Sequence, residues 1–186
     1  MKKIMFNDKY GLTLAVLEGR KTQTRRTFLK PGEETLLDGI TPEYLISVRS
    51  RYKVGETIAI AQSYKDIHAE ILREVGDLDL KKEFQQSKGY ANKMFVRAEK
   101  MPHAIRITNI RIERLQDISD EDCIKHGIWC DDNVGLEGTT YWYYGLVNSS
   151  FRTPQEAYAS LIDRISGKGT WASNPYVFVY DFELID

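Results

Sequence analysis

The sequence predicts an α+β domain built on a small mixed or antiparallel β-barrel with peripheral helices. Three observations lead to this prediction. Segments with the two-residue alternation of strands recur along the chain, a few helical patterns separate them, and no regular strand–helix–strand series is present. The chain has 186 residues, of which 42% are hydrophobic and 28% are charged, so we expect a single domain over residues 1–186.

The beginning of the chain predicts a strand, a helix and a second strand that leaves the helix end directly. Residues 1–6 form a short apolar strand, and Asn7 can cap the helix that follows. The apolar stripe of this helix is expected to contain Tyr10, Leu12, Leu14, Val16 and Leu17. Gly19 stands where a C-cap glycine belongs, so the next strand starts at a rigid junction.

A loop, one helical turn and a strand are expected next. Residues 31–40 have the composition of a loop, and Thr41-Pro42-Glu43 can open a single helical turn. The strand covers Thr57–Gln62, with Ile58 and Ile60 facing inward.

Residues 64–93 are predicted to be an insertion that packs on the barrel or projects from it. Their apolar positions have helical spacing and comprise Ile67, Ile71, Leu72 and Val75. A short strand is expected over Met94–Ala98 and a long one over Ala104–Leu115. The apolar alternation of the long strand changes phase at Asn109, which predicts a β-bulge or a sharp bend there.

The end of the chain predicts two helices and a closing strand. Ser119 can cap a short helix over Asp120–His126. Thr153-Pro154-Gln155-Glu156 has the pattern of a capping box with proline at the first helical position. The buried stripe of this second helix comprises Tyr158, Leu161, Ile162 and Ile165. The closing strand, Tyr176–Phe182, alternates aromatic residues with valines, so we expect both of its faces to be covered.

The main candidate for a functional site is the stretch Gly19–Arg26. Between Gly19 and Gly32 the chain contains five Lys or Arg residues and no Asp or Glu. Strand alternation would give one face Lys21, Gln23 and Arg25 and the other face Thr22, Thr24 and Arg26. One interpretation is a solvated surface strand. The other is an anion site, where guanidinium groups and an amine bind phosphate or a polarised carbonyl oxygen.

Gly19-Arg20-Lys21-Thr22-Gln23-Thr24-Arg25-Arg26 resembles the Gly-x-Lys-x-x-x-Arg signature of ASCH domains, which are relatives of the PUA-like RNA-binding barrels. Segments Lys53–Thr57 and Leu115–Ile128 resemble the segments that follow in that family. Asn174–Phe182 resembles the closing strand of a phage- and bacteria-associated branch. The resemblance implies a single ASCH domain with a PUA-like β-barrel.

The resemblance also implies recognition of RNA or nucleotides and, in one small bacterial branch, hydrolysis of the acetyl amide of N4-acetylcytidine. That branch uses a Lys, a Thr and a Glu, and the first two positions correspond to Lys21 and Thr24. A desolvated lysine beside other cations can lose its proton and activate a threonine hydroxyl. The Glu position falls on His126, which can transfer protons but carries no fixed negative charge at neutral pH.

We therefore expect an RNA- or modified-nucleotide-binding protein with a basic cleft. Its ligand-binding residues are predicted to be Gly19, Arg20, Lys21, Thr22, Arg25, Arg26 and the stacking aromatic Trp129. The alternative is a small amidohydrolase, or a nuclease, with Lys21, Thr24 and His126 as catalytic residues. A third hypothesis is a phage- or mobile-element protein that binds protein partners through residues 64–93.

Composition limits the remaining functional classes. A net charge of −1 argues against coating of nucleic acid by bulk charge, so any such binding requires a local patch. No apolar run has the length of a membrane span, and the first residues lack a signal-peptide core. The cysteines Cys123 and Cys130 form no disulfide framework, which favours the cytoplasm. Together with His126 they lack a fourth zinc ligand, so we predict no metal and no cofactor.

Overall fold

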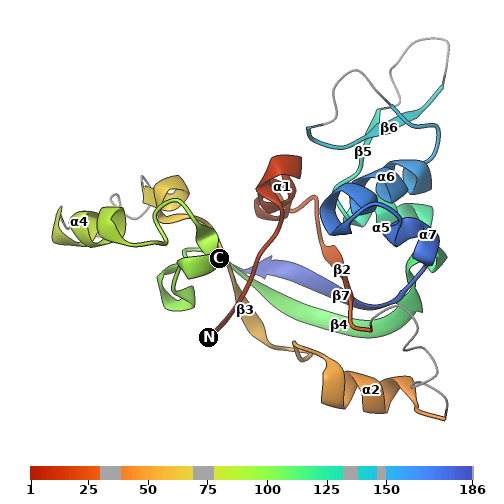
Figure 1. Cartoon of the computed structure of the whole chain (residues 1–186), viewed down its shortest axis with the longest axis horizontal. Helices are drawn as coiled ribbons and strands as arrows, with labels where there is room; N and C mark the ends of the chain where they lie inside the picture. Colours follow the sequence, from red (N-terminus) through yellow and green to blue (C-terminus); the bar gives the residue numbers. More distant parts are fainter. Residues whose placement is uncertain (30–38, 69–77, 132–137, 146–149, 186) are drawn as a thin grey trace.

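The computed structural model describes residues 1–29, 39–68, 78–131, 138–145 and 150–185, and of residues 78–81 it describes the backbone alone. Five strands form one mixed sheet in the order β1-β3-β4-β7-β2 (Figure 1). The strands cover Lys2–Ile4 (β1), Gln23–Thr27 (β2), Thr57–Ile60 (β3), Ala104–Arg114 (β4) and Tyr176–Ile185 (β7). β1 and β3 pair in parallel, and the other neighbours are antiparallel. The predicted α+β class is therefore confirmed.

The sheet is strongly curved and open. Among the described residues no backbone pairing joins the edge strands β1 and β2, so the strands do not close into a barrel. The two edges instead approach through a side chain, because the Arg26 guanidinium donates a hydrogen bond to the Met5 carbonyl oxygen at 2.7 Å. This arrangement leaves space between the edges, and the candidate site lies there.

The long strand β4 contains the predicted irregularity. Its register against β7 shifts between Ile107 and Asn109, as the phase change in the sequence indicated. The bulge directs Asn109 toward Asp181 of β7, whose carboxylate accepts a hydrogen bond from the Asn109 amide at 3.2 Å. Asp181 also receives bonds from residues that support the site, so the bulge contributes to its construction.

The first helical segment differs from the prediction. A 3-10 turn over Asp8–Tyr10 and helix α1 over Leu12–Leu17 replace the single helix expected after Asn7. Gly11 lies between them with a left-handed φ of 63°, which shifts the phase of the helix. Leu14, expected in the buried stripe, is consequently 50% exposed. The expected glycine junction is present, since Gly19 has a φ of 71° directly after α1.

Two other expectations about local structure were wrong. Helix α2 covers Pro42–Arg49, two turns instead of one, with its N-terminus capped by Thr41. The segment Met94–Ala98 is no strand, because 3-10 turns form over Lys93–Phe95 and Ala98–Lys100. The expected loop over residues 31–40 lies almost entirely outside the described residues.

Helices α1, α5, α6 and α7 lie on one side of the curved sheet, and α2 lies on the other (Figure 1). Helix α5 covers Asp120–Lys125 and is capped by Ser119, as predicted. Helix α6 covers Pro154–Ser166, and the short helix α7 covers Thr170–Ser173. Beyond α6 the strands β5 (Trp129–Asp131) and β6 (Thr140–Trp142) pair as a small second sheet that the sequence did not indicate.

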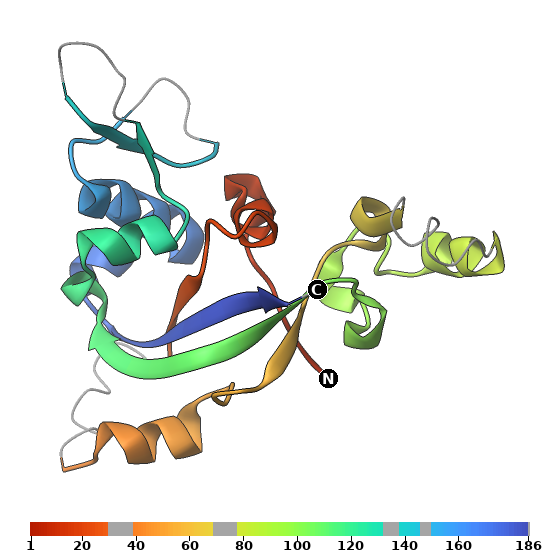
Figure 2. The ribbon, with the colours of Figure 1, turned by 180° about the vertical axis from the view of Figure 1, so that it is seen from behind.

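The predicted insertion extends from the end of the sheet where β7 ends (Figure 2). Its described part includes helix α4, Leu78–Gln86, and it forms a small core of its own. Tyr64 stacks on Phe84 with ring centroids 4.3 Å apart, and Ile67 is buried beside them. The other predicted stripe residues Ile71, Leu72 and Val75 lie outside the described residues.

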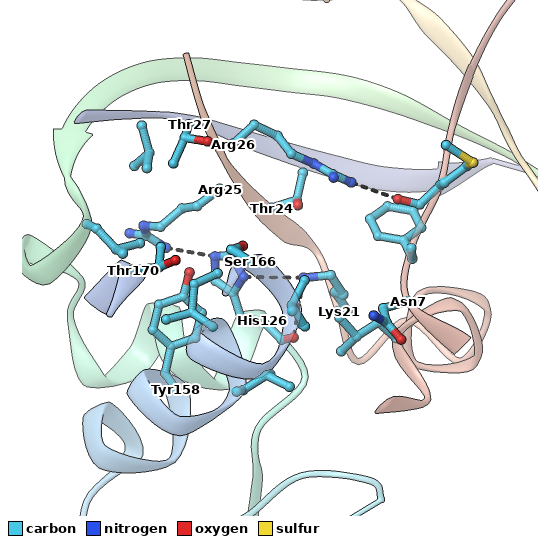
Figure 3. A pocket seen from close by; sticks show the side chains of 18 residues that line it. Asn7, Lys21, Thr24, Arg25, Arg26, Thr27, His126, Tyr158, Ser166 and Thr170 are labelled. Carbon is cyan, nitrogen blue, oxygen red and sulfur yellow. Dashed lines mark hydrogen bonds between the residues drawn. The ribbon is translucent and has the colours of Figure 1, made fainter. Parts of the chain in front are cut away.

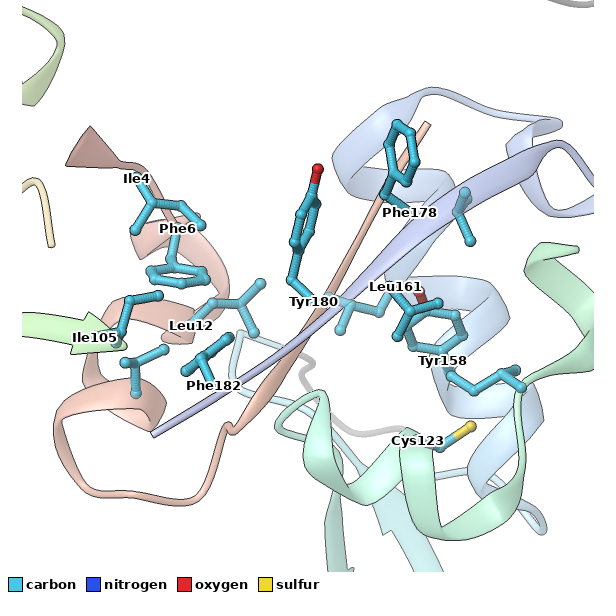
Figure 4. Close-up of a cluster of buried hydrophobic side chains, with 14 of the residues drawn as sticks. Ile4, Phe6, Leu12, Ile105, Cys123, Tyr158, Leu161, Phe178, Tyr180 and Phe182 are labelled. Carbon is cyan, nitrogen blue, oxygen red and sulfur yellow. The ribbon is translucent and has the colours of Figure 1, made fainter. Parts of the chain in front are cut away.

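The main core joins the sheet to the helices above it. Phe6 packs on Phe182 of β7 at one end of this core, and Tyr158 and Leu161 of α6 lie at the other (Figure 4). Both faces of β7 are buried, as its sequence pattern indicated. Because α6 also forms one wall of the candidate site, its packing on this core fixes the shape of that site.

We predict that Thr153→Ala lowers the free energy of unfolding by about 1 kcal/mol, because the N-terminus of α6 loses its cap. The Thr153 hydroxyl accepts a hydrogen bond from the Glu156 backbone N–H at 3.1 Å. Urea unfolding followed by circular dichroism measures the change. Thr153→Ser is the matched control and should retain most of the stability; equal destabilisation in both variants would contradict a capping role.

Candidate functional site

A cavity of about 500 Å³ lies beside the edge strand β2 (Figure 3). Helix α6 forms one wall, and the segment between β1 and the first 3-10 turn forms another. Its polar lining comprises Asn7, Lys21, Thr24, Arg25, Arg26, Thr27, His126, Tyr158, Ser166 and Thr170. No carboxylate is among the described lining residues. The structure therefore brings five predicted site residues together: Lys21, Thr24, Arg25, Arg26 and His126.

Lys21 is held at the junction between α1 and β2. Its backbone N–H bonds to the Ala15 carbonyl oxygen at 2.9 Å, which fixes the chain after the Gly19 turn. The residue is only 2% exposed. Its Nζ donates to the backbone oxygens of Gln23 at 2.7 Å and His126 at 3.3 Å, and it lies 3.3 Å from His126 Nδ1. His126 therefore faces Lys21, which the sequence alone could not show.

His126 stands at the C-terminal end of α5, where its backbone N–H bonds to the Asp122 carbonyl oxygen at 3.1 Å. Its ring packs against Tyr158 of α6 with centroids 4.8 Å apart. The second ring nitrogen, Nε2, lies 2.8 Å from a terminal nitrogen of Arg25. The imidazole is thus fixed between a guanidinium and an amine (Figure 3).

These contacts determine where the protons lie. A guanidinium can only donate, so His126 Nε2 must be the acceptor and a neutral ring carries its proton on Nδ1. The Nδ1–H then points at Lys21 Nζ, which can accept only as an uncharged amine. A neutral amine has two N–H donors and one lone pair, which matches the two carbonyl oxygens and the one N–H around Lys21.

The electrostatic environment favours the same protonation states. Burial lowers the pKa of Lys21 well below its ordinary value, and the charges of Arg26 and Arg25 lower it further. Burial likewise lowers the pKa of His126, together with the positive charge that Lys21 and Arg25 would bring. Both shifts favour the uncharged forms that the hydrogen bonds require.

Arg25 is buried completely and connects the cavity to a carboxylate cluster. One terminal nitrogen donates to Glu113 at 2.9 Å and to Asp122 at 3.0 Å, and the other bonds to Gln23 and His126. The two carboxylates compensate the buried charge. Asp122 does not line the cavity, because Arg25 stands between it and His126.

The carboxylate cluster extends outward to residues that the sequence analysis missed. Arg111 of β4 pairs with Asp122 at 2.6 Å and with Asp181 at 2.5 Å. Burial alone would raise the pKa of Asp122, but the Arg25 hydrogen bond and the charges of Arg25 and Arg111 hold it below its ordinary value. The carboxylate is therefore ionised at neutral pH. Only the alternation of charged residues on β4 could have suggested Arg111.

Two polar groups in the wall of the cavity have no partner among the described residues. The Tyr158 hydroxyl and Arg25 Nε are buried and make no hydrogen bond there. Burial raises the pKa of Tyr158, so its hydroxyl keeps its proton. Buried polar atoms are rarely left unpaired, so these two atoms mark hydrogen-bonding capacity in the cavity wall that the described residues do not use. The sequence placed Tyr158 in the buried stripe of α6 but gave no sign of this role.

The remaining predicted binding residues lie outside the cavity lining. Gly19 forms the turn before β2, and Thr22 bonds through its backbone to Lys125 and Phe182. Arg20 pairs with Glu18 and lies over the Trp129 ring, 4.0 Å from its centroid. Trp129 also stacks on Trp142 of the small second sheet at 5.1 Å. These residues support the neighbourhood of the site through contacts within the chain.

The two cysteines lie in different environments. Cys123 is buried in the main core, and burial raises the pKa of its thiol to about 12, whereas Cys130 is exposed. In the part of the chain that the structure describes, no three His, Cys, Asp or Glu side chains gather closely enough to hold a metal ion. None of the described helices is long and apolar enough to cross a membrane.

We predict that the stability of the protein rises with pH more steeply than that of a Lys21→Met variant. Folding lowers the pKa of Lys21 below 10.5, so between the folded and unfolded pKa values the unfolded chain binds one proton more. The free energy of unfolding then increases by up to about 1.4 kcal/mol per pH unit in this window and levels off above the unfolded pKa.

Urea unfolding between about pH 7 and 8.5 tests this prediction, because the interval lies below the ordinary Lys pKa of about 10.4. The Cys123 thiol acts in the opposite direction at the alkaline end, but both proteins contain it, so their difference isolates Lys21. Parallel curves for the two proteins would show that Lys21 is protonated in the folded state.

Comparison with models of known protein families finds no match, and comparisons with curated proteins and with solved structures find none either. The likeness of Gly19–Arg26 to the ASCH signature therefore remains a prediction. What the cavity can do follows from its own side chains.

Proposed function

We propose that this chain binds a nucleotide or a modified nucleoside, free or within RNA, in the cavity beside β2. The observation that carries the proposal is the composition of the cavity wall: cations, hydroxyls and a neutral imidazole, with no carboxylate among the described lining residues. The volume of about 500 Å³ lies within the range of small-molecule sites. Such a wall suits a ligand that offers acceptors and negative charge.

The cavity has an apolar wall, which suits the base of a nucleotide, and a polar wall, which suits its acceptor atoms and its phosphate. Leu161, Ile162 and Ile165 of α6 provide an apolar surface for a flat base. The Tyr158 hydroxyl can donate to a carbonyl or ring acceptor, since it has no described partner. Arg26 can donate to a phosphate or carbonyl oxygen at the open side.

The ASCH resemblance supports the proposal independently of the cavity. Its signature residues Lys21 and Arg25 both line the cavity, and so does Thr24. We further propose that the curved sheet is an open variant of a PUA-like barrel, in which the Arg26–Met5 hydrogen bond stands where strand pairing would close the edge. Recognition of RNA bases is the expected activity of such a fold.

A second candidate function is hydrolysis of an amide such as the acetyl amide of N4-acetylcytidine. The neutral state of Lys21, beside Thr24 in one cavity, favours it. Thr24 Oγ1 would attack the carbonyl carbon while the Lys21 lone pair, released from the His126 Nδ1–H, takes the hydroxyl proton. Collapse of the tetrahedral intermediate would break the C–N bond, with the Lys21 proton passing to the leaving amine. Water would then hydrolyse the acyl-threonine ester.

In this scheme His126 is a positioning residue and not the acid that the sequence analysis suggested. Its Nε2 faces the Arg25 guanidinium, so the ring cannot gain a second proton there without placing two donors against each other. Its Nδ1–H instead directs the Lys21 amine. The carboxylate of Asp122 reaches the cavity only through Arg25.

A panel of nucleosides and nucleoside monophosphates, including N4-acetylcytidine, tests the proposal by thermal shift and calorimetry. We predict that Lys21→Met weakens binding at least tenfold, equivalent to about 1.4 kcal/mol. Thr24→Val keeps the shape but removes a hydroxyl, and should weaken binding about fivefold if that hydroxyl contacts the ligand. Absence of binding by every compound would contradict the nucleoside site.

Chromatographic detection of cytidine separates catalysis from binding. Deacetylation that disappears in Thr24→Val and persists in Thr24→Ser would establish the hydrolase and its nucleophile. Binding without turnover would leave recognition as the function. A chain that acts only through a protein partner on residues 64–93 would tolerate Lys21→Met without functional change.

A further inference from the structure

A second cavity of about 320 Å³ adjoins the first between the two edges of the curved sheet. Met5, Arg26 and Thr27 line both cavities, so the two spaces meet at these residues. The remaining lining of the second cavity comprises Lys3, Ile4, Phe28, Arg49, Arg51, Tyr52, Phe178 and Tyr180. The Arg26–Met5 hydrogen bond runs between the two edges where the cavities meet (Figure 3).

The cations of the second cavity are not neutralised within the described chain. Arg26, Arg49 and Arg51 form no ion pair with a described carboxylate, and Lys3 donates only to the backbone oxygens of Met94 and Val96. Arg25, by contrast, is paired with two carboxylates. Three arginines, Arg26, Arg49 and Arg51, thus line one small space whose described lining contains no negative charge.

Packed aromatic residues line one side of the second cavity. Phe28 stacks on Phe178 at 4.1 Å, and Tyr52 meets Tyr180 edge-on at 5.2 Å. The Arg51 guanidinium lies over the Tyr52 ring, 5.5 Å from its centroid. The backbone that carries the cations is therefore fixed, while Arg26, Arg49 and Arg51 remain exposed.

Arg26 is placed to act in both cavities. Its guanidinium has five N–H donors, and the Met5 carbonyl oxygen takes one of them. A ligand group at the boundary could bond to the others without breaking the contact that joins the two edges. The planar fork suits the paired oxygens of a phosphate.

We propose that the second cavity is a phosphate subsite, which receives the phosphate attached to the nucleoside bound in the first. Arg26 bonds to this phosphate at the boundary, and Arg49 and Arg51 bind its outer oxygens or the next phosphate along an RNA strand. The inference rests on the proposed function, because it assigns the nucleoside to the first cavity. Beyond the proposed function, the second cavity implies that the ligand is phosphorylated and that the phosphate lies toward α2.

Fluorescence anisotropy with a labelled single-stranded octacytidylate tests the subsite. We expect Arg49→Ala/Arg51→Ala to weaken binding about tenfold and to reduce the dependence of log K on log salt by about 0.7 for each phosphate that the variant no longer binds. The matched control, Lys65→Ala/Lys88→Ala, removes the same charge from exposed positions of the insertion and should bind like the unmodified protein. Equal binding by all three proteins, or equal weakening in both variants, would overturn the proposal.

Competition distinguishes the source of the phosphate. Displacement of the octamer by cytidine monophosphate and not by cytidine indicates a terminal phosphate, whereas displacement only by unlabelled oligomer indicates a phosphodiester. Lys21→Met in the same assay separates the two proposals. If it binds RNA normally while the arginine variant does not, the phosphate subsite stands and the nucleoside cavity fails. If cytidine binds in the first cavity but neither a phosphate nor the two arginines contribute, only the subsite fails.

Discussion

The hydrogen bond from the Arg25 guanidinium to His126 is the contact on which the chemistry of the site depends. Because Arg25 can only donate, it fixes the imidazole tautomer, and the tautomer in turn requires a neutral Lys21. A buried guanidinium needs compensation, which Asp122 and Glu113 provide. The two carboxylates therefore influence the cavity without lining it, because they fix Arg25, and Arg25 in turn fixes the imidazole of His126.

The same strand end that carries this network also determines the shape of the ligand space. β2 is an edge strand, so its side chains can reach the cavity beside α6 and the space between the sheet edges. Arg25 turns inward and pairs with two carboxylates, whereas its neighbour Arg26 stays exposed and joins the edges. Two adjacent arginines in the sequence thus have different tasks, one structural and one at the boundary of two cavities.

Local signals in the sequence predicted much of what positions the site. Gly19 ends α1 and Ser119 caps α5, and the phase change at Asn109 marks the bulge, because each depends on a few neighbouring residues. Proximity of Lys21, Thr24, Arg25 and Arg26 follows from their closeness in the sequence, with Lys21 at the junction before β2 and the other three on this strand. The family resemblance assigned the Glu position to His126, but the sequence could not show that His126 faces Lys21, since 105 residues separate them. The clustering of Asp122, Glu113, Arg111 and Asp181 could not be predicted, because pairing of β4 with β7 and packing of α5 bring them together.

The tautomer of His126 tests the central claim most directly. Long-range nitrogen–proton NMR correlations distinguish the two neutral forms of a histidine ring, and comparison with a His126→Gln variant identifies the signals among those of His68 and His103. The account predicts a ring protonated at Nδ1 that stays neutral well below pH 6.5, the ordinary histidine pKa. A ring protonated at Nε2, or one that titrates near about pH 6.5, would mean that Arg25 does not fix the imidazole and that Lys21 is not held as a neutral amine.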